Sequence, residues 1–249
     1  MKHPLKERLA SAQGPVFGTW ISSASVVVAD ALKDLGFEWV MIDTEHSPIN
    51  PETVAAIIAL LADSGPRPMV RVGDVDQYMV KQALDAGAHG VLAPLVNSES
   101  DAAQLVRFAK YPPTGVRGAA AAAGSRYGLE LKSYLRDANV QTIVGVQIET
   151  RSALDHLDAI AAVEGVDLLF VGPQDLTLNL GFGVERSHPQ VHEAMRSVVA
   201  ACERHGKIPG TLVIDAEEKR AAIDLGFRFI SLAADLRFLL QGAKYYLQS

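Results

Sequence analysis

The sequence has little of several features that mark whole classes of protein. It contains one cysteine, Cys202, which excludes an internal disulfide framework and a cysteine-rich metal site and fits a reducing compartment. No apolar run approaches the ~18 residues of a membrane span, and no apolar segment follows the charged N-terminus as in a signal peptide. These absences predict a soluble cytoplasmic protein without a membrane partner.

Positive charge is scarce as well. Lysine and arginine number 23 against 29 aspartates and glutamates, a net charge of −6. A nucleic-acid binder needs a positive surface, so nucleic acid is not an expected partner. What remains is ordinary for a folded chain, with 49% hydrophobic and 21% charged residues. The 249 residues also match the length of a single α/β barrel, about 250 residues.

Short β-branched runs alternate with longer segments rich in alanine and leucine. Several of these runs are almost continuously apolar, as strands buried on both faces are. The expected strands are 15–21, 39–43, 68–72, 90–93, 142–148, 167–171, 208–213 and 229–232. The expected helices are 4–12, 25–35, 51–63, 76–86, 99–109, 152–162, 190–205, 216–225 and 234–247. Eight strand–helix pairs without a linker favour one (β/α)₈ barrel domain over residues 1–249 rather than an open, doubly wound sheet.

One stretch does not fit the alternation. Residues 111–141 are expected to form an irregular insert, which is too long for an ordinary barrel connection. A functional loop or a contact between subunits would explain its length. Its arginines Arg117 and Arg126 could reach an anion or could equally be surface charges.

In a (β/α)₈ barrel the chemistry takes place at the carboxyl ends of the strands. The polar residues expected there are Asp43, Glu45, His46, Arg71, Gln147, Glu149 and Asp175. Glu149 and Asp175 offer the hard oxygen ligands that suit Mg²⁺ or Mn²⁺; the alternative is that they are solvated rim charges or pair with Arg71. Among the seven histidines only His46 follows an expected strand, which makes it the candidate for acid–base work.

The positions of the lysines separate two kinds of carbon–carbon chemistry. A Schiff-base aldolase needs a desolvated lysine inside the barrel. No lysine lies on an expected strand. Imine chemistry is therefore disfavoured, and a metal would have to supply the electrophile.

Five segments resemble a known family when they are taken in order. They are Asp43-Thr44-Glu45-His46, Arg71-Val72, Tyr111-Pro112-Pro113-Thr114-Gly115-Val116-Arg117-Gly118, Gln147-Ile148-Glu149-Thr150 and Phe170-Val171-Gly172-Pro173-Gln174-Asp175-Leu176. Over essentially the whole chain the sequence resembles the HpcH/HpaI aldolase family, the class II pyruvate aldolases. This family includes 4-hydroxy-2-oxoheptanedioate, 2-dehydro-3-deoxyglucarate and 2-keto-3-deoxy-L-rhamnonate aldolases.

The resemblance implies reversible aldol cleavage of 4-hydroxy-2-oxoacids to pyruvate, or hydroxypyruvate, and an aldehyde. It implies one divalent metal ion, Mg²⁺, Mn²⁺ or Co²⁺, and no organic cofactor. It also implies a modified barrel in a homohexamer, a dimer of trimers, in which the helix at 234–247 is exchanged with a neighbour.

The resemblance also assigns roles by position. Glu149 and Asp175 would bind the metal, and Arg71 would hold the pyruvate carbonyl and stabilise the enolate. His46 would be the acid–base residue, with Asp43 in its hydrogen-bond network. Asp85 would increase the basicity of His46, which would require a contact between subunits. The implied substrate-binding residues are Arg71, Gln147, Gly172, Pro173, Gln174, Asp175 and Leu212.

Two departures from the family pattern leave the metal site untouched. Gly73-Asp74 stands where many relatives have Pro or Trp, and an alanine run replaces more varied residues after Gly118. These changes leave the acceptor aldehyde open. Two other functions also stay open: a metal-dependent lyase acting on an acyl-CoA thioester, for which no convincing basic cluster is present, and a barrel that only binds a ligand.

Overall fold

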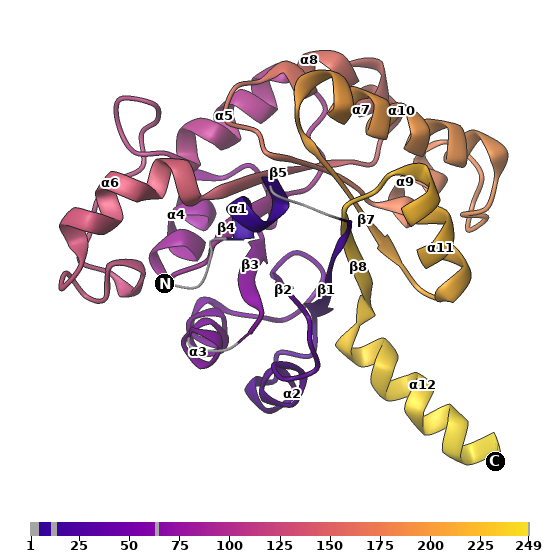
Figure 1. Ribbon diagram of the computed structural model, residues 1–249, viewed down its shortest axis with the longest axis horizontal. Coiled ribbons are helices and arrows are strands. Elements are labelled where there is room, and N and C mark those ends of the chain that lie inside the picture. The colour runs from indigo at the N-terminus through magenta and orange to yellow at the C-terminus, as the bar shows by residue number, and fades with distance from the viewer. Residues whose placement is uncertain (1–4, 11–13, 63–64, 249) are drawn as a thin grey trace.

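Eight parallel strands close into a barrel in the computed structural model, which describes residues 5–10, 14–62 and 65–248 (Figure 1). Each strand pairs with the next along the chain, and the last pairs with the first. The strands are β1 (Val16–Ile21), β2 (Trp39–Asp43), β3 (Arg67–Arg71), β4 (Gly90–Ala93), β5 (Ile143–Ile148), β6 (Leu168–Val171), β7 (Ile208–Val213) and β8 (Phe229–Ala234). The predicted (β/α)₈ barrel is confirmed.

Most of the helices surround the barrel (Figure 1). The described helices are α1 (Leu5–Ala10), α2 (Val26–Leu32), α3 (Pro51–Leu61), α4 (Gln77–Asp85), α5 (Glu99–Ala109), α6 (Leu131–Gln141), α7 (Arg151–Asp155), α8 (Leu157–Ala162), α9 (Pro173–Asn179), α10 (Pro189–His205), α11 (Ala216–Leu225) and α12 (Asp235–Gln248). Many begin at a side chain that caps the first turn. Before α3 the side chain of Asn50 accepts a hydrogen bond from the backbone N–H of Thr53, and before α11 the side chain of Asp215 accepts one from the backbone N–H of Glu218.

The structure differs from the sequence expectation in three places. The insert is not irregular, because it contains a short 3₁₀ turn at Ala123–Ser125 and then α6. The segment after β6 forms α9, and the expected helix at 152–162 is divided into α7 and α8. Residues 4, 11 and 12 of the expected first helix, and residue 63 of the expected third, lie outside the described residues.

The barrel interior is filled with large side chains, which confines any site to its rim. Trp39 and Phe229 stack inside the barrel with ring centroids 3.8 Å apart. Gly18 permits this packing, because a Cβ there would lie 2.1 Å from the Trp39 ring. A second apolar layer, rich in valine, isoleucine and leucine, lies between the strands and the helices. The filled interior leaves the carboxyl ends of the strands as the place for chemistry.

The last helix leaves the barrel. Figure 1 shows α12 running away from the other elements to the C-terminus. Among the described helices and strands it contacts mainly β1 and β8, and its Phe238 stacks on Phe37. Its apolar side chains are exposed, Leu239 by 66% and Leu240 by 61%. Among the described residues no helix is both long enough and apolar enough to cross a membrane.

Candidate active site

The turn after β2 is organised by Asp43, the buried last residue of that strand. Its Oδ1 accepts the backbone N–H groups of Glu45 at 3.1 Å and of His46 at 3.2 Å. One carboxylate therefore fixes the backbone of both Glu45 and His46 at the carboxyl end of the barrel. The side chain of His46 is 65% exposed there, and that of Glu45 is 16% exposed.

Arg71, at the end of β3, is held from several sides. Strand register places it beside Asp43, whose two carboxylate oxygens accept from Nε at 3.0 Å and from Nη2 at 2.8 Å. Its Nη1 donates to Oε1 of Gln147 at 3.4 Å and lies 2.9 Å from Oε2 of Glu45. The Trp20 ring covers one face of the guanidinium, with Cζ 4.4 Å from the ring centroid. The positive charge is therefore fixed in position before any substrate arrives.

Glu149 follows β5 and is a buried carboxylate with an unusual environment. Its Oε1 accepts the amide of Leu95 at 2.9 Å, and its Oε2 accepts Nε2 of Gln147 at 2.6 Å. Burial raises the pKa of Glu149 to about 7, the charges of Asp175 and Glu45 raise it further, and the Leu95 amide and Arg71 oppose the shift. No lysine or arginine of the described residues forms an ion pair with this carboxylate.

Asp175 lies in the first turn of α9, directly after β6. Gly172 is the N-cap residue of this helix, Pro173 is its first residue, and Asp175 is exposed at the rim. A helix N-terminus favours a carboxylate in this place. Gly172 also leaves the space that Glu149 occupies, because a Cβ at Gly172 would lie 2.5 Å from Oε2 of Glu149.

These residues fit a divalent cation. Burial and the negative charge of Asp175 both disfavour the ionised form of Glu149. A cation bound by the two carboxylates would offset both effects. The described residues contain no group of three or more His, Cys, Asp and Glu side chains placed to hold a metal. Two carboxylates, with water and substrate oxygens as the other ligands, are the usual protein contribution to a Mg²⁺ site.

The structure brings most of the expected site residues together. Asp43, His46 and Arg71 lie on the same rim as Gln147 and Glu149. Pro173 and Leu212 line a neighbouring cavity of about 330 Å³ between β7, α9, α10 and α11. Gln174, between Pro173 and Asp175, has a buried Nε2 for which the described residues supply no acceptor.

Asp85 lies elsewhere in the chain. It is the last residue of α4, near the amino end of β4, whereas His46 follows the carboxyl end of β2. Its Oδ1 accepts from Nη2 of Arg117 at 2.7 Å, and the same Nη2 donates to the hydroxyl of Tyr134 on α6 at 3.0 Å. Arg117 is fully buried and is therefore not a surface charge. Within one chain Asp85 does not reach His46.

Sequence reasoning assigned no role to two residues of the site. Trp20 lies near the end of the expected strand 15–21, but its stacking on Arg71 depends on which strands lie beside β1. The Leu95 amide reaches Glu149 because Leu95 adopts a left-handed backbone with φ 51°. A strained backbone of this kind often marks a functional site.

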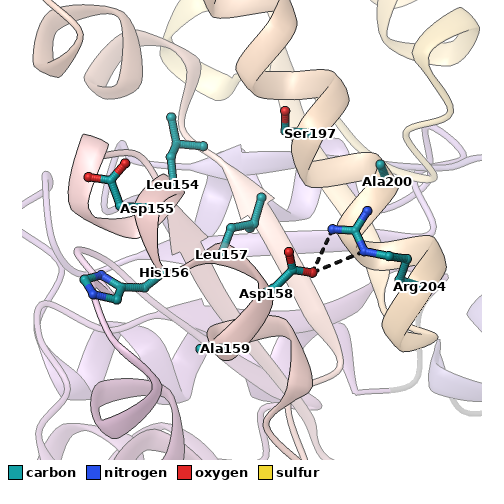
Figure 2. A pocket seen from close by; sticks show the side chains of 9 residues that line it. All are labelled: Leu154, Asp155, His156, Leu157, Asp158, Ala159, Ser197, Ala200 and Arg204. Atoms are coloured by element: carbon teal, nitrogen blue, oxygen red, sulfur yellow. Dashed lines mark hydrogen bonds and ion pairs between the residues drawn. The ribbon is translucent and has the colours of Figure 1, made fainter.

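A second groove, of about 440 Å³, lies on the outer surface between α7–α8 and α10 (Figure 2). Asp158 and Arg204 pair across it with Nη2 and Oδ1 2.7 Å apart, and both side chains are more than half exposed. An exposed pair that satisfies itself in this way offers no catalytic group.

A barrel with a fixed arginine and two acidic residues, Glu149 and Asp175, at its carboxyl rim is typical of enzymes that stabilise developing negative charge. Residues 16–241 match the family described as HpcH/HpaI aldolase/citrate lyase, and the chain belongs to that family. The resemblance noted from the sequence is therefore confirmed.

Individual relatives agree with the family match. The chain is 38% identical to the hydroxypyruvate/pyruvate aldolase of Paraburkholderia phytofirmans, over 99% of this chain and 96% of the relative. It is 35% identical to the 4-hydroxy-2-oxo-heptane-1,7-dioate aldolase of Escherichia coli, over 98% and 93%. The crystal structure of a family protein from Burkholderia cenocepacia has a TM-score of 0.94 at 37% identity and covers 98% of this chain and 97% of that one.

Proposed function

We propose that the protein is a metal-dependent aldolase that cleaves 4-hydroxy-2-oxoacids to pyruvate, or hydroxypyruvate, and an aldehyde. The observation that carries the proposal is the buried Glu149, without an ion-pair partner among the described residues and with its pKa raised to about 7, beside the fixed guanidinium of Arg71. This arrangement would place a cation site beside a fixed positive charge on one rim. The relatives named as aldolases support the same activity.

The residues of the rim fit the steps of a retro-aldol reaction. Breaking the C3–C4 bond of the substrate leaves an enolate on the pyruvate half. Arg71, held by Asp43, is the group that stabilises the oxygen charge of that enolate. His46 takes the proton of the 4-hydroxyl group, because its imidazole is exposed at the mouth of the barrel, where the substrate enters.

Glu149 and Asp175 would hold the divalent cation. When bound, Mg²⁺, Mn²⁺ or Co²⁺ supplies a Lewis acid that polarises the 2-oxo group of the substrate. Gln147 keeps Glu149 in place because its Nε2 donates a 2.6 Å hydrogen bond to Oε2 of Glu149, and its Oε1 accepts from Nη1 of Arg71. Gln147 therefore links the cation site to the arginine.

Among the residues that the structure describes, no lysine on this rim is a candidate for a Schiff-base mechanism. The strands β1–β8 contain no lysine. Lys110 is buried and its pKa is lowered to about 8 by burial, but its Nζ donates to the carbonyls of Asn139 and Thr142, just before β5 begins. It lies at the amino end of the barrel and therefore does not supply an imine at the site.

We further propose that residues 1–249 form one domain and that six chains assemble as a dimer of trimers with α12 exchanged between neighbours. The exposed apolar face of α12 and its departure from the barrel support this proposal. An assembly would also give Asp85 a route to the His46 of another chain.

The test is pyruvate release from a 4-hydroxy-2-oxoacid, coupled to lactate dehydrogenase. We expect release that stops with EDTA and returns with Mg²⁺, Mn²⁺ or Co²⁺, and we expect none from Glu149→Gln. Release that persists after exhaustive chelation would refute the proposal. Cleavage confined to an acyl-CoA thioester would indicate the alternative lyase.

A further inference from the structure

Glu45 is an ionisable residue of the rim that the proposed mechanism does not yet use. It stands between Arg71 and His46, the two groups to which the mechanism assigns charge stabilisation and proton transfer. Its Oε2 lies 2.9 Å from Nη1 of Arg71, and its Oε1 lies 3.6 Å from Nε2 of His46. Its two carboxylate oxygens therefore face two different functional groups.

The position of Glu45 is set by its neighbours. Its backbone N–H is bound to Oδ1 of Asp43, and its Oε2 is buried, with the Arg71 ion pair as its contact. The pKa of Glu45 is raised because burial disfavours the carboxylate; Arg71 and His46 act in the opposite direction, and Asp43 and Asp175 add to the rise. Arg71 therefore anchors one oxygen and leaves the other directed at the imidazole.

His46 has one carboxylate within ion-pair distance among the described residues, and that carboxylate belongs to Glu45. Within the chain Asp85 is held by Arg117 near the other end of the barrel. A histidine that accepts a proton during catalysis gains from a fixed carboxylate, which sets its tautomer and stabilises the imidazolium that forms.

We propose that Glu45 is a positioning residue for His46: its carboxylate, anchored by Arg71, orients the imidazole through Nε2 and stabilises its protonated form. The inference rests on the proposed aldolase function. Because Nε2 faces Glu45, Nδ1 is then the ring nitrogen that exchanges the proton with substrate.

The first test is Glu45→Gln, which keeps the shape of the side chain and removes its charge. Loss of one charge-assisted contact corresponds to roughly a tenfold to hundredfold fall in kcat. The KM for the oxoacid should stay within about threefold, because the two bonds from Asp43 still hold Arg71. The matched control is Glu52→Gln, which alters an exposed glutamate on α3 and should leave kcat unchanged.

A double-mutant cycle shows whether Glu45 acts through His46. In a His46→Asn background, Glu45→Gln should change the residual rate by no more than about twofold. An equal loss of kcat in both backgrounds, or no loss in the wild-type background, would overturn the inference. A wild-type enzyme that releases no pyruvate would instead refute the proposed function.

The wild-type chain supplies a second readout, which stands even if Glu45→Gln does not fold. We expect ¹⁵N NMR of histidine-labelled protein, with the His46 signals assigned by comparison with His46→Asn, to show the neutral ring protonated at Nε2. A neutral ring protonated at Nδ1 would contradict the proposed contact.

Discussion

Replacing Gly172 by alanine tests the cation site with one methyl group. The backbone of Gly172 has φ −87°, which any residue adopts, so the effect of the substitution is steric. The new Cβ would lie 2.5 Å from Oε2 of Glu149 and 3.2 Å from Nε2 of Gln147, whereas ordinary van der Waals contacts begin at 3.4 Å. The Glu149 carboxylate must therefore retreat by about 0.9 Å.

A retreat of this size is large for a metal ligand. Mg²⁺ demands near-ideal geometry with oxygen distances of about 2.0–2.1 Å. Disturbing the groups that orient a ligand typically lowers metal affinity by 10–100-fold, which is about 1.4–2.8 kcal/mol. We expect at least this loss for Gly172→Ala, together with a fall in stability of about 1–3 kcal/mol from overpacking.

The assay is Mn²⁺ binding by electron paramagnetic resonance, with urea unfolding of the same samples. Gly73→Ala is the matched control, because its Cβ would meet no atom closer than 3.7 Å on the same rim. We expect the control to bind Mn²⁺ as the wild type does. Wild-type affinity in Gly172→Ala would refute the assignment of Glu149 as a ligand.

Three further predictions concern stability and assembly. Burial raises the pKa of Glu149 from 4.5 to about 7, so this carboxyl group ionises at a higher pH in the folded metal-free chain than in the unfolded chain. The free energy of unfolding should therefore fall by about 3 kcal/mol as the pH rises through that interval. Urea unfolding at pH 5 and pH 8 should show a smaller fall in Glu149→Gln. Leu239→Asp combined with Leu240→Asp should reduce the assembly to smaller species in sedimentation equilibrium, and an unchanged mass would exclude exchange of α12. Arg117→Ala leaves Asp85 unpaired and should lower the free energy of unfolding by about 3 kcal/mol in urea titrations; a change below about 1 kcal/mol, the usual range for an exposed pair, would contradict the buried ion pair.

The strands could be read from the sequence because of how they are buried. Most of them are covered on one side by the barrel interior and on the other by helices, so the run is almost continuously apolar, as in the buried β5, where Gln147 is the one polar side chain. Expected and observed strand bounds therefore agree closely, with β8 extending to Ala234. The helix α6 was missed because it lies in the insert that was expected to be irregular, and because Ala138 is the one residue that it buries.

The candidate site was predictable to the extent that it depends on strand ends. Glu149 and Arg71 were placed on one rim because the carboxyl ends of parallel strands meet there. The contacts of Arg71 with Trp20 and Glu45 depend on side-chain directions across neighbouring strands, which a single sequence does not specify. The role implied for Asp85 involves a second chain, and the fold of one chain leaves it as a proposal.

We propose that Arg71 and a cation held by Glu149 and Asp175 together stabilise the enolate of pyruvate. Exchange of the pyruvate methyl protons in deuterated water, followed by NMR, measures enolate formation without an aldehyde. We expect exchange in the wild type with Mg²⁺, none after chelation or in Glu149→Gln, and a rate roughly 10²–10³-fold lower in Arg71→Ala. Exchange at the wild-type rate in metal-free protein or in Arg71→Ala would contradict the account.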